Sequence, residues 1–180
     1  VTTDTEIESQ NMIDYLCSCG HKRIAFITSR DEGLGRCHLN GYKRALEKNG
    51  LEYDEKLIIR LKPAKRIYTI ENGYNCTCEL LKSGVDFSCI YAISDTLAVG
   101  ACRAIIDSGK RVPEDYCVAG ADGQDIAEYY HPSITTLKYP RVETAQQSVR
   151  TLFDMIDRKK VVKRQILGGT LIERESTRKL

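Results

Sequence analysis

The chain has 180 residues, 42% of them apolar, so it can bury the core of one domain or slightly more. Lysine and arginine (27 residues) nearly balance aspartate and glutamate (25), and the net charge of +2 excludes a broadly basic surface for binding nucleic acid. No stretch approaches the roughly 20 apolar residues of a membrane span, and no signal peptide is recognisable. Residues 1–4 have the character of a domain interior, so we expect further sequence before them.

Most of the eight cysteines lie in apolar stretches that are predicted to form helices or strands. Buried free thiols of this kind are typical of a reducing compartment, whereas disulfide frameworks belong mainly to short, loop-rich secreted chains. The pairs at 17–19 and 76–78 have C-x-C spacing, which differs from the C-x-x-C spacing of structural zinc sites. We therefore expect free thiols, a cytoplasmic protein, and neither a metal nor another cofactor.

Four short apolar runs indicate strands, and their starts are about 30 residues apart, the span of a βα unit. They cover residues 24–27, 57–59, 89–93 and 117–119. Helical patterns alternate with these runs, and each is followed by a glycine that can close a helix in the left-handed conformation. These helices cover residues 39–46, 74–81 and 97–105. The alternation predicts an α/β fold with a parallel sheet flanked by helices.

The last part of the chain departs from this alternation. Residues 134–137 are predicted to form a strand, 142–156 a long amphipathic helix, and 166–173 a final strand or hairpin. The basic run at 159–164 fits an exposed turn between the helix and that strand.

The sequence Gly-Leu-Gly at 33–35 follows a predicted strand and opens a helix, as a dinucleotide-binding loop does. That motif needs a third glycine where the helix packs on the strand, but His38 occupies the position. The pattern therefore favours a glycine turn, although the amides at the helix start can still bind an anion or a hydroxyl.

Catalytic patterns are absent from the sequence, which contains neither a G-x-S-x-G elbow nor an H-E-x-x-H helix. The three histidines, His21, His38 and His131, each lie beside a predicted strand or turn, where structural histidines are common. The sequence thus favours a protein that is not an enzyme.

Two acids, Asp95 and Asp122, follow predicted strands. Open α/β sheets bind ligands beyond the carboxyl ends of their strands, so these acids and the loop around Arg36 and His38 form a candidate ligand site. The alternative is that each carboxylate caps the helix that follows it.

Seven blocks in a fixed order cover nearly the whole chain. They are GHKRIAFI at 20–27, NGYKRAL at 40–46, SDTLAVGA at 94–101, GKRVPED at 109–115, VAGAD at 118–122, PSITTL at 132–137 and LIEREST at 171–177. Together they resemble the effector-binding domain of lac-repressor-type (LacI/GalR) transcriptional regulators.

The resemblance implies a periplasmic-binding-protein-like fold (type I), in which two α/β lobes close on a small effector after a helix-turn-helix head. This chain resembles the family from the second lobe onward. Residues 1–133 then form the C-terminal effector-binding lobe, 134–160 a crossover strand and helix that return toward the first lobe, and 161–180 the final strands and tail. We expect the effector-sensing part of a DNA-binding repressor, with operator contact only through the preceding head, homodimerisation, and no membrane partner.

The resemblance assigns effector contacts to several positions. Asp122 matches the family's effector-binding aspartate, although Ala121 replaces the usual aromatic residue before it. His38 stands where the family places an arginine, with Arg36 two residues earlier, so a titratable ring replaces a fixed guanidinium.

Ser94 stands at a position that is often polar and touches the ligand, next to Asp95. Tyr68 falls where an aromatic residue stacks on the effector, and Tyr139 matches a crossover position near the cleft. Carboxylates, hydroxyls and aromatic rings suit a sugar, because acids accept its hydroxyl hydrogens and rings cover its apolar faces.

Two other classes of protein remain open at this point. An exported sugar-binding protein of a transporter shares the fold, but the cysteines argue against an oxidising compartment. A small α/β enzyme is disfavoured because no nucleophile and base stand at a recognisable spacing.

In the family, dimers pair through surfaces that correspond here to residues 72–83, 97–108 and 126–131.

Overall fold

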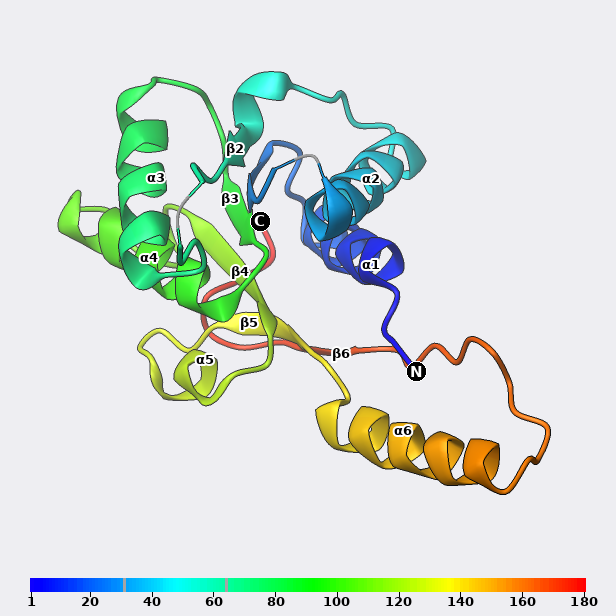
Figure 1. Ribbon diagram of the computed structural model, residues 1–180. Helices are drawn as coiled ribbons and strands as arrows, with labels where there is room; N and C mark the ends of the chain where they lie inside the picture. The colour runs from blue at the N-terminus through cyan, green and yellow to red at the C-terminus, as the bar shows by residue number, and fades with distance from the viewer. Residues whose placement is uncertain (31, 64) are drawn as a thin grey trace.

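The computed structural model describes residues 1–30, 32–63 and 65–180, and its centre is a single six-stranded sheet (Figure 1). The strand order is β2-β1-β3-β4-β5-β6; β1 to β5 are parallel, and β6 pairs antiparallel with β5. The strands are β1 Ile24–Thr28, β2 Ile58–Arg60, β3 Cys89–Ala92, β4 Cys117–Asp122, β5 Thr135–Lys138 and β6 Thr170–Ile172. The predicted α/β class with a mainly parallel sheet is confirmed.

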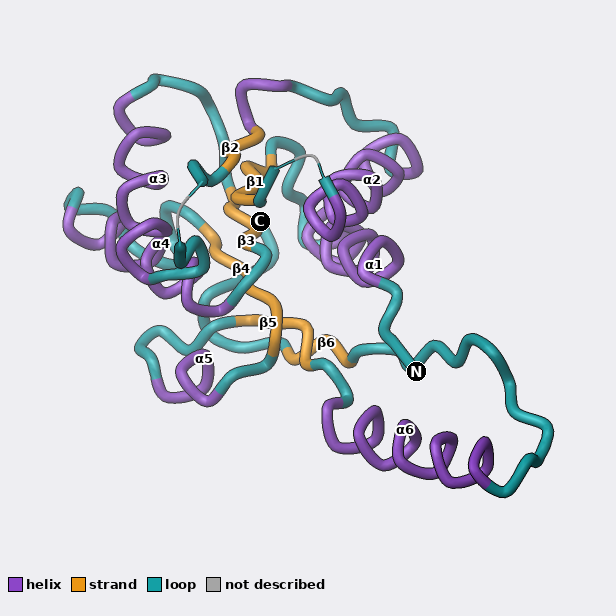
Figure 2. Tube along the Cα trace, in the orientation of Figure 1, coloured by secondary structure: helices purple, strands orange, loops and turns teal. Residues whose placement is uncertain are grey.

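Helices cover both faces of the sheet, as Figure 2 shows. On one side α1 (Thr5–Ser18) packs against α2 (Gly33–Lys48), and on the other α3 (Ile70–Lys82) packs against α4 (Asp95–Asp107). A short helix, α5 (Asp125–Tyr129), follows β4, and a longer one, α6 (Arg141–Ile156), follows β5. Among the described residues, no helix is both long and apolar enough to span a lipid bilayer.

Three elements differ from the sequence prediction. The second strand begins at Ile58 because Leu57 closes a 3₁₀ turn, Glu55–Leu57, whose start the Asp54 side chain caps. The final strand has only three residues, and Ile166 contributes an isolated parallel bridge to Thr2 instead. Helix α1 was not predicted, since its buried face includes polar residues that interrupt the apolar pattern.

The core lies between the sheet and the two helix pairs. Every residue of β1 and β3 is buried, as expected for strands covered on both faces. On the α1–α2 side, Tyr42 and Tyr91 both stack on Phe26, with ring centroids 5.0 and 5.2 Å from it. On the other side α3 and α4 approach closely, because a Cβ atom on Gly100 would stand 2.1 Å from the Ile70 carbonyl oxygen.

Helix α6 stands apart from this body in Figure 1. None of its residues is buried, although its sequence is amphipathic. The chain ends near the body: the amide of Leu180 donates to the carbonyl oxygen of Cys19, at a distance of 2.8 Å.

Candidate functional site

A pocket of about 320 Å³ lies beyond the carboxyl ends of the parallel strands, where ligands bind in folds of this type. It is lined by Thr2, Thr3, Thr5, Leu34, His38, Tyr68, Ile93, Ser94, Asp122 and Tyr139. We call it the inner pocket. Five of the seven predicted site residues therefore come together there, and Arg36 and Asp95 do not line it. Arg36 is exposed on α2, two residues before His38.

Asp122 ends β4 in an unusual backbone conformation, with φ at +105°. This region is costly for a residue with a side chain and persists only where surrounding contacts impose it. One such contact is the Gln124 side-chain amide, which donates to the Asp122 carboxylate at 2.8 Å, and another is Arg141, which donates to the Asp122 carbonyl oxygen at 3.0 Å. Burial raises the pKa of Asp122 above 3.8, while Gln124 and Arg141 oppose that rise. A strained, half-buried carboxylate is thus presented to the inner pocket.

Asp95 does not line the inner pocket and is fully buried. Its carboxylate accepts one hydrogen bond from the Thr136 hydroxyl and one from the backbone amide of Gln124, both at 2.6 Å. Burial raises the pKa of Asp95 to about 6, against the effect of these two donors. A Cβ atom on Gly120 would stand 2.4 Å from this carboxylate, so only glycine fits there. Asp95 therefore fixes the segment that carries Asp122.

His38 is almost fully buried and faces a chain of hydroxyl groups. Its Nδ1 lies 3.2 Å from the Ser9 hydroxyl, which in turn donates to the Tyr91 hydroxyl at 3.4 Å. A neutral histidine ring has one nitrogen that donates a hydrogen bond and one that accepts. Burial lowers the pKa of His38 to about 4, so the ring is neutral near pH 7.

Ser94, and not Asp95, is the N-cap residue of α4, since its hydroxyl accepts from the Leu97 amide at 3.4 Å. Thr96 donates to the Tyr68 carbonyl oxygen at 3.2 Å and so anchors the loop that carries the Tyr68 ring. Tyr139 lies just after β5, and burial raises the pKa of its hydroxyl.

The inner pocket combines a carboxylate, a neutral imidazole, several hydroxyl groups and two phenol rings. Its lining contains neither lysine nor arginine, so it has no fixed positive charge for a phosphate or carboxylate ligand. Within the described parts of the chain, no three His, Cys, Asp or Glu side chains are placed to hold a metal ion. The arrangement can accept and donate hydrogen bonds to a neutral ligand that carries several hydroxyl groups.

The sequence did not reveal every residue of this site. Thr2, Thr3 and Thr5 line the inner pocket, but they belong to no recognisable sequence motif. Gln124 and Thr136 donate hydrogen bonds to the carboxylates of Asp95 and Asp122 and so position them. Thr136 lies in the block at 132–137, so that block was a usable signal, whereas nothing marked Gln124.

A pocket of this composition at the ends of a parallel sheet defines a small-molecule-binding domain. The family model described as a periplasmic binding protein-like domain matches residues 13–177. The transcriptional regulator MalR of Clostridium butyricum is 40% identical over 146 residues, which are 81% of this chain and 42% of the relative. The chain spans about half the length of the curated relatives it matches.

Solved structures agree with this match. A LacI-family sugar-binding transcriptional regulator from Escherichia coli, solved with phosphate, is 33% identical with a TM-score of 0.90, over 99% of this chain and 63% of that one. The complex of the regulator CelR with cellobiose is 32% identical with a TM-score of 0.86, over 97% of this chain and 52% of that one. The chain belongs to the periplasmic-binding-protein-like effector domain of LacI-family transcriptional regulators.

Proposed function

We propose that this chain is the effector-sensing part of a transcriptional repressor and that its effector is a neutral sugar. The observation that carries this proposal is the pairing of strained Asp122 with uncharged His38 in one pocket. Both present acceptors to sugar hydroxyl groups, and Tyr68 and Tyr139 supply aromatic surface. The cellobiose complex of CelR supports the same class of ligand.

The proposal extends to the rest of the regulator. Residues 1–133 and 161–180 form the C-terminal lobe, and 134–160 return to a first lobe that covers the inner pocket from the other side. A helix-turn-helix head in the longer protein contacts the operator, and two copies pair through α3, α4 and residues 126–131. The regulator works in the cytoplasm, and the pocket binds its ligand without converting it. The relatives, which are transcriptional regulators, support this assignment.

With one wall of the cleft present, the 180-residue chain should bind a sugar weakly. Each hydrogen bond exchanged with water contributes about 1 kcal/mol net, and immobilising the ligand costs several times as much. We expect millimolar or undetectable affinity for this chain and much tighter binding when the first lobe encloses the ligand.

The test of the proposed function is calorimetry on a chain that carries these residues together with a first lobe. Asp122→Ala should weaken sugar binding by about 1–3 kcal/mol, because hydroxyl groups of the ligand lose their acceptor. A ligand shifts the equilibrium between two conformations only by the difference in its affinity for them. Asp122→Ala should therefore also weaken the control that the sugar exerts on operator binding.

Two further variants control this experiment. Asp122→Asn removes the charge and tolerates a positive φ, so it separates the carboxylate's role from backbone strain. Asp86→Ala removes an exposed carboxylate outside the pocket and should leave the affinity unchanged. Unchanged sugar affinity in both Asp122 variants would show that the site lies elsewhere.

A further inference from the structure

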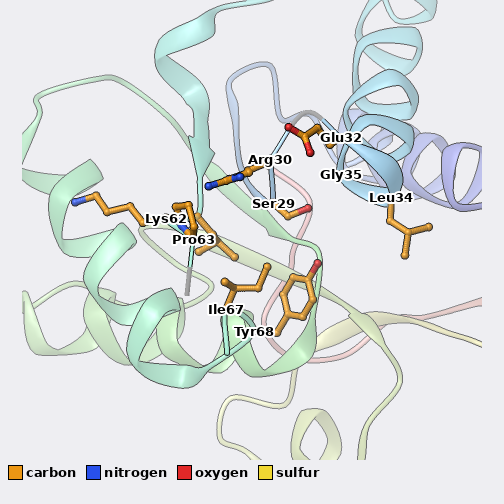
Figure 3. Close-up of a pocket in the computed structure, with 10 residues that line it drawn as sticks. Ser29, Arg30, Glu32, Leu34, Gly35, Lys62, Pro63, Ile67 and Tyr68 are labelled. Carbon is orange, nitrogen blue, oxygen red and sulfur yellow. The ribbon is translucent and has the colours of Figure 1, made fainter. Parts of the chain in front are cut away.

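A second cavity of about 340 Å³ adjoins the inner pocket, and we call it the outer pocket (Figure 3). It lies between the loops that follow β1 and β2. Leu34 and Tyr68 line both cavities, so the two are neighbours across these side chains. Leu34 is 66% exposed and Tyr68 46% exposed, so both present apolar surface at the junction. A ligand that crosses from one cavity to the other would cover this surface.

The walls of the outer pocket are held by the sheet. The amide of Leu61 donates to the carbonyl oxygen of Thr28 at 2.8 Å, which continues the β1–β2 pairing into the two loops. The first turn of α2 packs directly on the β1 loop, because a Cβ atom on Gly35 would stand 2.0 Å from the Arg30 carbonyl oxygen. Gly33 turns the chain with φ at +50°. The Gly-Leu-Gly sequence thus serves to build this wall, and it leaves Leu34 between the two cavities.

The outer pocket has an apolar side and a polar side. Leu61, Pro63 and Ile67 supply apolar surface, and Ser29, Arg30 and Glu32 supply a hydroxyl, a cation and a carboxylate. Figure 3 shows the Ser29 hydroxyl and the Tyr68 ring pointing toward one another, whereas the amine of Lys62 points away from the cavity. Its lining carries two cations, Arg30 and Lys62, against the one carboxylate of Glu32, and Arg30 is the cation beside Ser29 and Glu32 on the polar side.

We propose that the outer pocket is a second subsite and that the effector is a neutral disaccharide. One sugar ring occupies the inner pocket, the glycosidic bond passes between Leu34 and Tyr68, and the second ring lies in the outer pocket. The apolar face of the second ring covers Pro63 and Ile67, and its hydroxyl groups bond to the polar side. This inference rests on the proposed function and adds the size and charge of its ligand.

Volume and charge support this assignment. Each cavity alone is near the lower end of the roughly 300–1,000 Å³ that small-molecule sites occupy, and together the two offer a larger site. A phosphate group in the inner pocket would find no cation there, because neither lysine nor arginine lines that cavity. A lone monosaccharide would leave the exposed surface of Leu34 and the whole outer pocket uncovered.

The experiment compares disaccharides with their own monosaccharides on the 180-residue chain, by saturation-transfer NMR titration. The probes are cellobiose, maltose, trehalose, sucrose, lactose and melibiose, each beside its component sugars, with glucose 6-phosphate as the charged comparison. We expect at least one disaccharide to bind about 5-fold or more tightly than either of its components, because it adds contacts without a second loss of translational freedom.

Variants assign that gain to the outer pocket. Ile67→Ala should weaken binding of the selected disaccharide by about 3- to 10-fold and leave its monosaccharide unchanged. Ile70→Ala is the matched control, because Ile70 is also partly exposed but lines neither cavity. Glu32→Gln, at an exposed position, should also weaken only the disaccharide and guards against a folding defect at Ile67.

Three outcomes are decisive. Weaker disaccharide binding in Ile67→Ala and Glu32→Gln, with the monosaccharide unaffected, supports the second subsite. Disaccharides that bind no better than their components, or tightest binding of glucose 6-phosphate, would overturn it and leave sugar sensing intact. If a sugar binds and Asp122→Ala leaves its affinity unchanged, the proposed function itself fails.

Discussion

Helices α4 and α6 were both predicted from the spacing of their apolar residues, but they have very different surroundings. Nine of the thirteen residues of α4 are buried against α3 and the sheet. None of the sixteen residues of α6 is buried, and its apolar side chains are exposed. They are Val142, Val149, Leu152, Phe153, Met155 and Ile156. The periodic pattern therefore predicts a helix equally well whether or not the surface that it packs against belongs to the same chain.

The comparison shows which of the two helices is stabilised by packing within this chain. Helix α4 gains its stability from packing, whereas α6 is held to the body at few points, such as the bond from Arg141 to the Asp122 carbonyl oxygen. A large apolar face without a partner marks an interaction surface. Paired substitutions can measure the difference in stability between the body and the outlying segment, by which we mean residues 141–169.

The largest expected effect is at the contact between α3 and α4. In Gly100→Ala the new methyl group meets the Ile70 carbonyl oxygen, so the helices must separate, and the free energy of unfolding should fall by about 2–4 kcal/mol. Gly168→Ala is the matched control in the outlying segment, because no atom lies within 4 Å of its Cβ position. Urea unfolding followed by circular dichroism measures both, and equal effects would contradict the contrast.

A smaller effect on the free energy of unfolding is expected where α1 contacts the chain just before β6. Glu8 on α1 is buried, accepts a hydrogen bond from the Gly169 amide at 3.0 Å, and has a second carboxylate oxygen without a partner. Burial raises the pKa of Glu8 from 4.5 to about 7, so the folded state favours the protonated acid. Its contribution to stability is then complete below pH 4.5 and is lost as the pH rises through about 7.

Glu8→Gln should remove this pH dependence while keeping an acceptor for Gly169. Between pH 5 and pH 8, the difference in unfolding free energy between variant and wild type should change by about 1–3 kcal/mol in favour of the variant. Urea titrations of both proteins across that range check this. Parallel stability curves would mean that Glu8 is charged and solvated in the folded chain.

The smallest effect on stability is expected in α6. Phe153 is 61% exposed, so Phe153→Ser should change the unfolding free energy by no more than about 0.5 kcal/mol. It should nevertheless reduce self-association of the chain, which we expect to be dimeric or larger when light scattering is measured at micromolar concentration. Ile7→Ser, at an exposed position on α1, is the control. Association unchanged by Phe153→Ser would show that the α6 face is not a contact surface.

The sequence predicted the repeating part of the fold because long apolar runs and glycine stops are local signals. It missed α1 because Glu8 and Ser9 lie on the buried face of that helix and interrupt its apolar periodicity. The sequence also did not show that β6 is short, because its length of three residues is set by its pairing with β5.

The candidate site was predictable to a similar degree. Asp122 ends β4 and Ser94 comes soon after β3, so the parallel sheet brings them together. The burial of Asp95 was not visible, because it depends on Thr136 from a strand about 40 residues away. Nor was the neutral state of His38, which depends on the depth of the core around it.

Amide chemical-shift mapping of the 180-residue chain with a neutral sugar at millimolar concentration tests the central claim most directly. We expect shifts in one cluster at His38, Tyr68, Ser94 and Asp122, with little change along α3 and α6. The cluster should disappear in Asp122→Asn and persist in Asp86→Ala. Shifts centred on α6, or an unaltered cluster in Asp122→Asn, would contradict the placement of the effector at the carboxyl ends of the strands.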